Sequence, residues 1–230
     1  MKLYDRQGTP NAARIRVVIA EKGLEGTIAY QTVDLIAAEQ KRPAFLAMNP
    51  IGKTPVLELD DGLCLSECTA ITEYLDNLDG RPVLTGTTPR EKAVIHMLQR
   101  RVEIMLLDPV DDYFHYGIAG LGPVVAPWRK PDWAAEDKER WGRRRGQEFL
   151  ANLPWFEEHL ADRAFLAGEA YSMADITLLA AIDFAWGIGL AAGELPPNLS
   201  AWRGRMEAQP AVRDRSGRDL LPEDIWRRGG

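Results

Sequence analysis

Residues 54–71, TPVLELDDGLCLSECTAI, contain two short apolar runs followed by the start of an amphipathic helix. The runs 54–59 and 63–66 are separated by Asp60-Asp61-Gly62, and Asp and Gly tolerate the dihedral angles of a tight turn. We therefore predict a β-hairpin that leads directly into a helix over Glu67–Leu78.

The residues before this hairpin predict alternating strands and helices. Lys2–Asp5 and Ile28–Leu35 have the short apolar pattern of strands. Pro10–Lys22 and Pro43–Met48 are predicted helices, the first with apolar residues at helical spacing. The order is strand, helix, strand, short helix, hairpin, helix. It predicts an α/β domain over residues 1–80 with a mixed four-stranded sheet.

After residue 80 the strand pattern ends. Residues 81–88 are rich in Pro, Gly and small polar side chains, which indicates a linker. The remaining residues, 89–230, predict an all-α domain. Its expected helices run from Thr88 to about Leu107, with Pro109 bending or ending the first, and then over 132–160, from Met173, and over 199–207.

One apolar stretch, Ile176–Gly193, is long enough to raise the alternative of a membrane span. Asp183 interrupts it, and Ser172 and Asp175 have the spacing of a capping box, as at the start of a helix in a globular protein. We therefore predict a helix buried in the centre of the second domain and no membrane association.

Composition narrows the class of protein. The chain has 230 residues, 46% of them hydrophobic and 27% charged, as is typical of a globular protein. Its net charge of −6 argues against a nucleic-acid partner. Two cysteines, Cys64 and Cys68, are too few for a disulfide framework, and Met1-Lys2-Leu3-Tyr4 does not begin a signal peptide. These features predict a cytoplasmic protein.

The first segment whose residues suggest a chemical role is Gly8-Thr9-Pro10-Asn11, directly after the first predicted strand. Thr9 occupies the N-cap position and Asn11 lies one residue beyond the first helical residue, so a hydroxyl and an amide lie near unpaired backbone N–H groups. The positive end of the helix dipole stabilises an anion there, including a thiolate. An ordinary helix cap is the alternative interpretation.

Two further segments suggest a peptide-like ligand. In 49–55, NPIGKTP, Lys53 supplies a cation, and a cis bond before Pro55 would expose the backbone of Thr54 to an extended peptide. In 66–71, SECTAI, a second strand-to-helix junction offers backbone N–H groups to a carboxylate, while Glu67 can accept an amine. Together these groups suit the head group of an amino acid.

The spacing of the three segments resembles that of the cytosolic glutathione transferases, and Thr9-Pro10-Asn11 looks most like bacterial enzymes near the nu class. The resemblance extends more loosely into the second domain, where Tyr171–Ile176 is similar to the family's capping box. It implies a thioredoxin-like first domain, a helical second domain and glutathione as co-substrate.

The resemblance also assigns roles to residues at matching positions. Thr9 and Asn11 would stabilise the glutathione sulfur as the catalytic pair. The remaining assignments concern the ends of the tripeptide. They place the glycyl carboxylate at Lys53 and Gln40, the cysteinyl backbone at Thr54 with Pro55 cis, and the γ-glutamyl group at Glu67 and Cys68.

Cys68 departs from the family, which usually has Ser or Thr there. A thiol is a weak donor, so we expect glutathione binding to depend on the Cys68 backbone N–H and to be weaker. The loop after the first strand contains neither Cys nor Tyr, which argues against cysteine-type and tyrosine-activated classes.

The predicted function is transfer of glutathione to an electrophilic small molecule. Tyr113, Phe114 and Tyr116 are candidates for an apolar pocket, with packing in the core as the alternative. A glutathione-dependent disulfide reductase or thiol lyase is a second hypothesis, and a binding protein that has lost the chemistry is a third. The three histidines are too scattered to predict a metal site. The resemblance implies a homodimer.

Overall fold

The computed structural model describes residues 1–118 and 132–215, and it divides into two compact units. One unit comprises Met1–Ala93 with Glu207–Gly230, and the other comprises Val94–Met206. Compared with the expected domains, the first unit also takes in residues 81–93 and the segment from residue 207. Residues 119–131 and 216–230 of the expected second domain lie outside the described residues.

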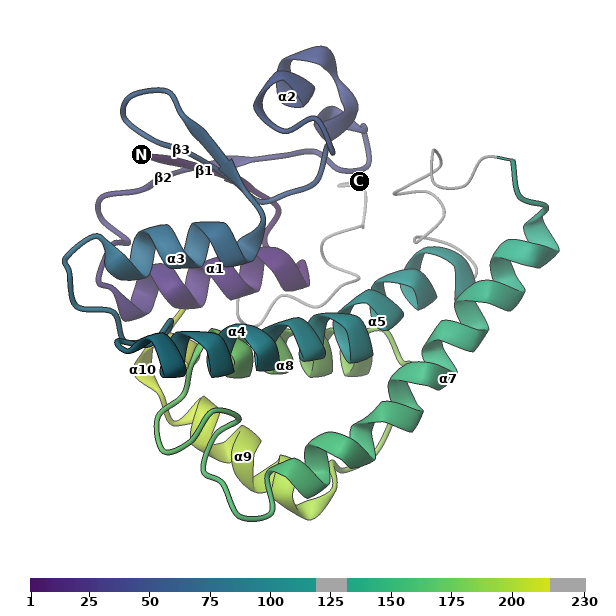
Figure 1. Cartoon of the computed structure of the whole chain (residues 1–230). Coiled ribbons are helices and arrows are strands. Elements are labelled where there is room, and N and C mark those ends of the chain that lie inside the picture. Colours follow the sequence, from purple (N-terminus) through teal and green to yellow (C-terminus); the bar gives the residue numbers. More distant parts are fainter. Residues whose placement is uncertain (119–131, 216–230) are drawn as a thin grey trace. The chain divides into compact units, whose positions relative to one another are not determined.

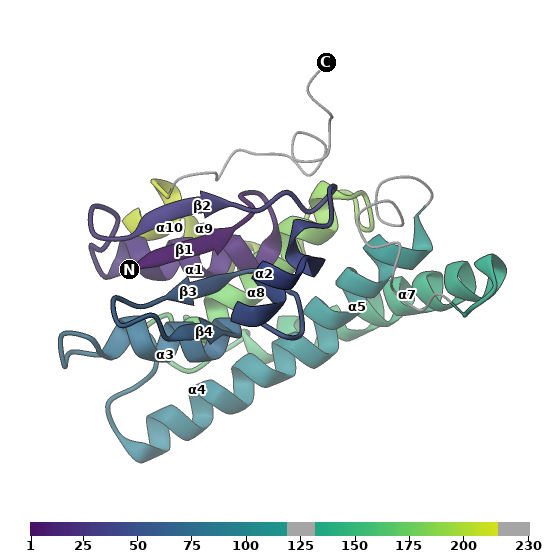
Figure 2. The ribbon, with the colours of Figure 1, turned by 90° about the horizontal axis from the view of Figure 1, so that it is seen from above.

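The first unit contains the expected mixed sheet of four strands. They are β1 (Lys2–Asp5), β2 (Ala29–Thr32), β3 (Val56–Glu58) and β4 (Cys64–Ser66), in the order β2-β1-β3-β4 (Figure 2). β1 is parallel to β2 and antiparallel to β3, which is antiparallel to β4. The predicted hairpin is thus confirmed. Because β3 pairs with β1 in antiparallel direction, the loop that precedes β3 and the loop that follows β1 meet at one end of the sheet.

Helices cover both faces of this sheet. α1 (Pro10–Glu21) and α3 (Cys68–Asn77) lie side by side on one face, and α2 (Pro43–Met48), preceded by the short helix η1 (Glu39–Lys41), lies on the other (Figure 1). The apolar residues at helical spacing in α1 and α3 are fully buried; they include Ile15, Ile19, Ile71 and Leu75. Their burial fixes which way the two helix N-termini point.

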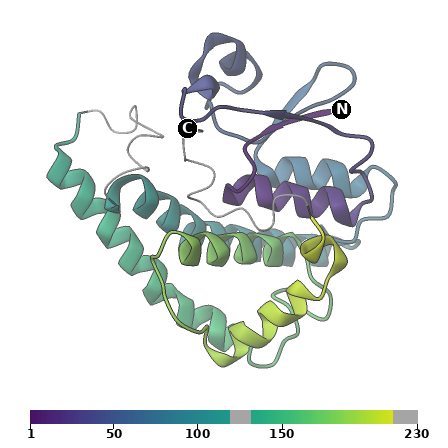
Figure 3. The same cartoon turned by 180° about the vertical axis from the view of Figure 1, so that it is seen from behind.

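A buried carboxylate holds the segment after α3 to the first unit. Asp76 is fully buried, and its oxygens accept hydrogen bonds from the backbone N–H groups of Val83, Leu84 and Thr85 at 2.9–3.0 Å. At the other end of the chain, α10 (Pro210–Arg213) packs against α1 (Figure 3). These contacts explain why both segments belong to the first unit.

The second unit is helical. A continuous helical run comprises α4 (Pro89–Val102), which begins in the first unit, then the π-helix η2 (Glu103–Leu107), α5 (Asp108–Asp112) and the π-helix η3 (Tyr113–Gly117). α7 (Ala135–His159), α8 (Met173–Gly187) and α9 (Pro197–Glu207) follow. Every expected helix is present.

Pro109 does not end the first of these helices. The run continues to Gly117, because the π-helical turn η2 ends at Leu107, two residues before Pro109, and rearranges the backbone hydrogen bonds with which a proline would otherwise interfere. α7 begins at Ala135 with Ala134 as its N-cap, three residues after the predicted start of this helix at residue 132.

The predicted buried helix is α8, in which twelve of fifteen residues are buried. Ser172 and Asp175 form the predicted capping box. Asp175 also accepts hydrogen bonds from the Leu166 N–H at 2.8 Å and from Trp202 Nε1 at 3.0 Å, so it joins α8 to α9. Among the described residues, no helix is both long and apolar enough to cross a membrane.

Candidate functional site

The start of α1 is the first candidate subsite. Thr9 is the N-cap residue in extended conformation, Pro10 is the first helical residue, and the Thr9 side chain does not cap the helix. A helix start that its own N-cap side chain leaves uncapped offers its first backbone N–H groups to an anion. The Thr9 hydroxyl donates to the Arg6 carbonyl at 2.8 Å, so its proton points away from the helix end.

Asn11, the other predicted residue of this subsite, has its amide oxygen occupied. Its Oδ1 accepts a hydrogen bond from Arg14 Nη1 at 3.1 Å. Its Nδ2 has no hydrogen-bond partner among residues 1–118 and 132–215. The amide therefore keeps its two N–H donors for a ligand.

The start of α3 is the second subsite. Glu67 is the N-cap residue with φ +69° and ψ 123°, a region that side-chain-bearing residues rarely adopt, and such backbone strain clusters at functional sites. Its exposed side chain does not cap the helix. The Cys68 thiol donates to the Asn11 carbonyl at 3.6 Å. This contact joins the N-termini of α1 and α3, which lie 57 residues apart in the sequence.

The loop before β3 is the third subsite. The Thr54–Pro55 bond is cis, as the resemblance implied. The side chain of Asn49 braces this loop, since Nδ2 donates to the Lys53 carbonyl at 2.8 Å and Oδ1 accepts from the Ile51 N–H at 3.1 Å. Lys53 itself is exposed. The hydrogen bonds of Asn49 thus hold the loop in one conformation, in which the Lys53 side chain and the backbone of Thr54 can be reached by a ligand.

Gln40 lies next to this loop although it is twelve residues away in sequence. A Cβ at Gly52, which has φ +62°, would lie 2.6 Å from the Gln40 carbonyl oxygen, so only glycine permits this approach. Gln40 is buried, and its Oε1 has no partner among the described residues. Lys41, which the sequence reasoning missed, donates from Nζ to the Ile51 carbonyl at 2.8 Å. The neighbouring cations Lys41 and Lys53 suit a carboxylate.

The aromatic candidates belong to the second unit. Phe114 and Tyr116 are buried, and the Phe114 ring packs edge-on against Phe184 at 5.2 Å between centroids. Tyr113 is partly exposed and lies over Gly146, where a Cβ would meet its ring at 2.6 Å. The described contacts of all three are therefore packing contacts within the second unit.

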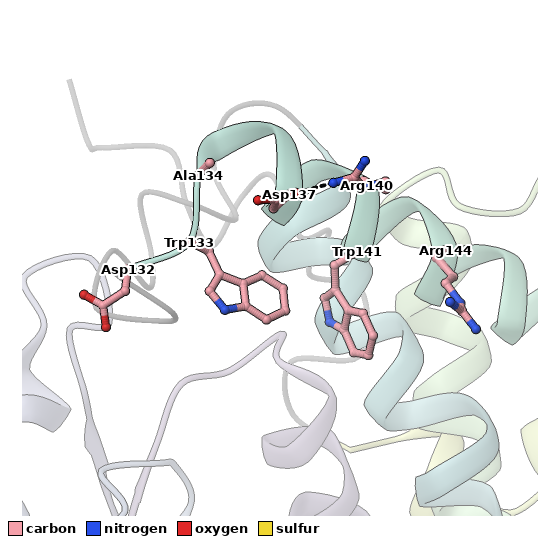
Figure 4. A pocket seen from close by; sticks show the side chains of 7 residues that line it. All are labelled: Asp132, Trp133, Ala134, Asp137, Arg140, Trp141 and Arg144. Carbon is pink, nitrogen blue, oxygen red and sulfur yellow. Dashed lines mark hydrogen bonds and ion pairs between the residues drawn. The ribbon is translucent and has the colours of Figure 1, made fainter.

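A hollow of about 460 Å³ lies at the start of α7 (Figure 4). The indole rings of Trp133 and Trp141 meet there nearly at right angles, with centroids 6.1 Å apart. Its other lining residues are small or charged: Asp132, Ala134, Asp137, Arg140 and Arg144. No spacing motif pointed to it, because tryptophans eight residues apart are not a recognisable signature.

No group of three or more His, Cys, Asp or Glu side chains within the described ranges is arranged to hold a metal ion. The candidate subsites of the first unit offer N–H donors, cations and the exposed carboxylate of Glu67. Two helix N-termini, an amide and a polar loop are brought together there. This arrangement suits a ligand with several charged groups and an extended backbone.

Comparison with known proteins identifies the family. Residues 1–77 match the family model "Glutathione S-transferase, N-terminal domain", and residues 133–210 match "Glutathione S-transferase, C-terminal domain". The chain is 44% identical to Glutathione S-transferase 2 of Saccharomyces cerevisiae, over 93% of this chain and 88% of the relative.

Solved structures agree with this result. The structure of Gtt2 from Saccharomyces cerevisiae has a TM-score of 0.85 and 43% identity, over 93% of this chain and 99% of the other. A glutathione S-transferase domain-containing protein from Marinobacter aquaeolei has a TM-score of 0.83 and 40% identity, over 92% and 100%. The relative at 44% identity is a yeast enzyme, so the comparisons do not support the expected similarity to the bacterial nu-like group. The fold, the family models and the relatives together show that this chain belongs to the glutathione S-transferases and is a glutathione transferase.

Proposed function

We propose that the first unit activates glutathione by stabilising its thiolate at the start of α1, for attack on an electrophilic small molecule. The observation that carries this proposal is the pair of helix N-termini without side-chain caps, joined by the hydrogen bond between Cys68 and Asn11. The thiol is at α1 and the γ-glutamyl group is at α3. The proton leaves to solvent, and the sulfur then forms the bond to the electrophilic carbon as that carbon loses its leaving group, which is chloride for a chlorinated aromatic substrate.

The interaction free energies available at the start of α1 are sufficient to lower the pKa of the glutathione thiol without a general base. A thiol with a pKa of about 8.5 is only a few per cent thiolate at pH 7, and lowering that pKa by about 2 units requires roughly 2.7 kcal/mol. A helix N-terminus contributes about 0.3–1 kcal/mol. One hydrogen bond to a charged group adds about 1.5–3 kcal/mol. The Asn11 amide and the helix end together therefore meet the requirement.

Within this pair we assign the main donor role to Asn11 and a supporting role to Thr9. The Thr9 hydroxyl donates to the Arg6 carbonyl and would have to rotate to reach the sulfur, whereas Asn11 Nδ2 already has its donors available. Asn11→Ala is then expected to raise the pKa of bound glutathione by about 1–2 units. Thr9→Val is expected to have the smaller effect, and the ultraviolet thiolate band followed across pH measures both.

The rest of the tripeptide follows the three subsites. Thr54, ahead of the cis Pro55, pairs with the cysteinyl backbone. Glu67 accepts the γ-glutamyl amine, and the backbone N–H of Cys68 donates to the γ-glutamyl carboxylate, because the thiol of Cys68 is engaged with Asn11. The glycyl carboxylate lies at the cations flanking the loop, with Gln40 adjacent; these are Lys41 and Lys53.

For the electrophile we assign Tyr113 as the residue of the second unit that meets it, since its ring is partly exposed. Phe114 and Tyr116 are buried, so we assign them to the packing of the second unit rather than to contact with the electrophile. A glutathione-dependent disulfide exchange remains the alternative reaction, because the loop after β1 has no protein cysteine and two glutathiones can react directly. Turnover of a chlorinated aromatic compared with a small disulfide separates the two reactions.

We propose that the protein works as a cytoplasmic homodimer whose protomers have domains over 1–80 and 89–230. Two free cysteines support a reducing compartment. On the second unit, Met97, Ile104 and Leu150 are large apolar side chains that are 41–52% exposed, which supports burial by a second copy. Sedimentation of the purified chain tests the dimer, and a monomeric mass at micromolar concentration refutes it.

A further inference from the structure

Arg14 is a buried arginine on the helix that carries the proposed thiolate donor. Only 5% of it is exposed, and its Nη1 donates to Asn11 Oδ1 at 3.1 Å across one turn of α1. The nearby Arg16 is equally buried and forms a bidentate ion pair with Asp5 at 2.8 and 3.0 Å. The two buried arginines of α1 therefore differ in one respect that matters here, because Arg14 contacts the side chain of Asn11.

The contact between Arg14 and Asn11 fixes the orientation of the amide. A side-chain amide has an acceptor end and a donor end of nearly the same shape, and a flip exchanges them. Guanidinium donates hydrogen bonds and accepts none. Turning the Asn11 amide round would set two donors against each other, so Oδ1 must face Arg14. Nδ2 then faces away, and it has no partner among the described residues.

We propose that Arg14 is a positioning residue for glutathione activation: it holds the Asn11 amide with its N–H donors directed at the sulfur and its oxygen directed away. The proposal rests on the thiolate role assigned to Asn11 above. A flipped amide would direct its oxygen at the thiolate, and the resulting repulsion would favour the protonated thiol. Arg14 acts through Asn11 and does not itself contact glutathione.

The test measures the pKa of glutathione bound to the full-length protein, from the ultraviolet thiolate band. Arg14→Met removes the donor and leaves the amide free to flip. We expect the pKa of the bound thiol to rise by about one unit, which is about a tenfold loss of thiolate at a pH well below that pKa. The rate at saturating glutathione falls in proportion, while the KM for glutathione changes less than about twofold, because the ends of the tripeptide keep their contacts.

Two substitutions at the same position and one matched control sharpen the result. Arg14→Lys keeps a side chain that donates and cannot accept, so it is expected to recover most of the lost thiolate. Arg14→Gln can accept from a flipped Asn11, and it should behave like Arg14→Met; it serves as the test if the methionine variant does not fold. Arg16→Met removes an equally buried arginine from α1, and it should lower stability without moving the pKa of the bound thiol.

A double-mutant cycle separates this inference from the proposed function. In an Asn11→Ala background, Arg14→Met should produce no further change in the pKa of the bound thiol. The positioning role is overturned if Arg14→Met has the same effect with and without Asn11, or has none while Asn11→Ala does raise the pKa. If Asn11→Ala itself leaves that pKa unchanged, the donor role of Asn11 is wrong, and the inference falls with it.

Discussion

Gly142, in the middle of α7, allows two helices to touch through their backbones. A Cβ added at Gly142 would lie 2.1 Å from the Gly117 nitrogen, 2.5 Å from the Tyr116 carbonyl carbon and 2.6 Å from the Gly117 Cα. Ordinary van der Waals contact begins at about 3.4 Å. All three atoms are backbone, so no side-chain rotation relieves the clash. Gly142→Ala must therefore push α7 away from η3.

Two effects oppose each other in this substitution. Alanine is favoured over glycine by about 1 kcal/mol in a helix interior. Overpacking a tight contact costs typically about 1–3 kcal/mol, and the short backbone distances place this case at the upper end. We expect a net loss of about 2 kcal/mol in the free energy of unfolding. For a chain of this size that corresponds to a fall in Tm of about 4–8 °C.

The chain supplies its own control. Gly204 lies inside α9 with nothing within 4 Å of an added Cβ, so Gly204→Ala gains the helix preference without a clash. It should raise the free energy of unfolding by about 0.5–1 kcal/mol. Urea and thermal unfolding, followed by circular dichroism, measure both variants. If Gly142→Ala is as stable as Gly204→Ala, the close approach of α7 and η3 is wrong.

Three further substitutions test other parts of the chain. Asp175→Ala leaves buried N–H donors without an acceptor and should cost about 4 kcal/mol or more in urea unfolding, whereas Asp175→Asn, which keeps one oxygen, should cost less. Hydrogen bonds from the hydroxyl and backbone N–H of Thr87 and from the backbone N–H of Thr88, just before α4, lower the pKa of Glu91 from 4.5 to about 2. Its contribution to stability is therefore present above pH 4.5 and lost as the pH falls toward 2, so the urea midpoints of wild type and Glu91→Gln should converge over that range; a constant difference would contradict the assignment. Cys68→Ser replaces a weak donor with a stronger one and should tighten glutathione binding by about 2- to 10-fold in calorimetry, and weaker binding would show that the thiol contact with Asn11 matters more.

Local patterns predicted most of the elements. The turn residues 60–62, the helix start at Thr9-Pro10 and the capping box at Ser172 each depend on neighbours a few residues apart. Such interactions can be inferred from spacing alone, and the structure confirms them. The contact between Asn11 and Arg14 is of the same kind, since residues three apart share a helix face. Spacing alone is therefore enough to predict it.

Where the structure departs from the sequence predictions, the bounds of elements differ and the elements themselves are present. Pro109 was expected to bend or end its helix; it does not end it, since the helical run continues through a π-helical turn before the proline. α7 begins at Ala135, later than the predicted start at residue 132. The residues after α3 pack with the first unit because the buried carboxylate of Asp76 binds their backbone, a contact that local spacing does not predict.

By itself, the sequence determined the order of strands and helices and the two-part organisation, because these follow from periodicity, capping and turn chemistry over short spans. The residues proposed for the glutathione site came from the resemblance of three short segments to a known family. Only the tertiary structure decided which groups are available to a ligand. The Thr9 hydroxyl is turned to Arg6, the thiol of Cys68 is engaged by Asn11, and Gln40 lies against Gly52. The last two contacts join residues that are distant in the chain, and all three depend on how buried surfaces orient the backbone. One-dimensional spacing carries no information about that orientation.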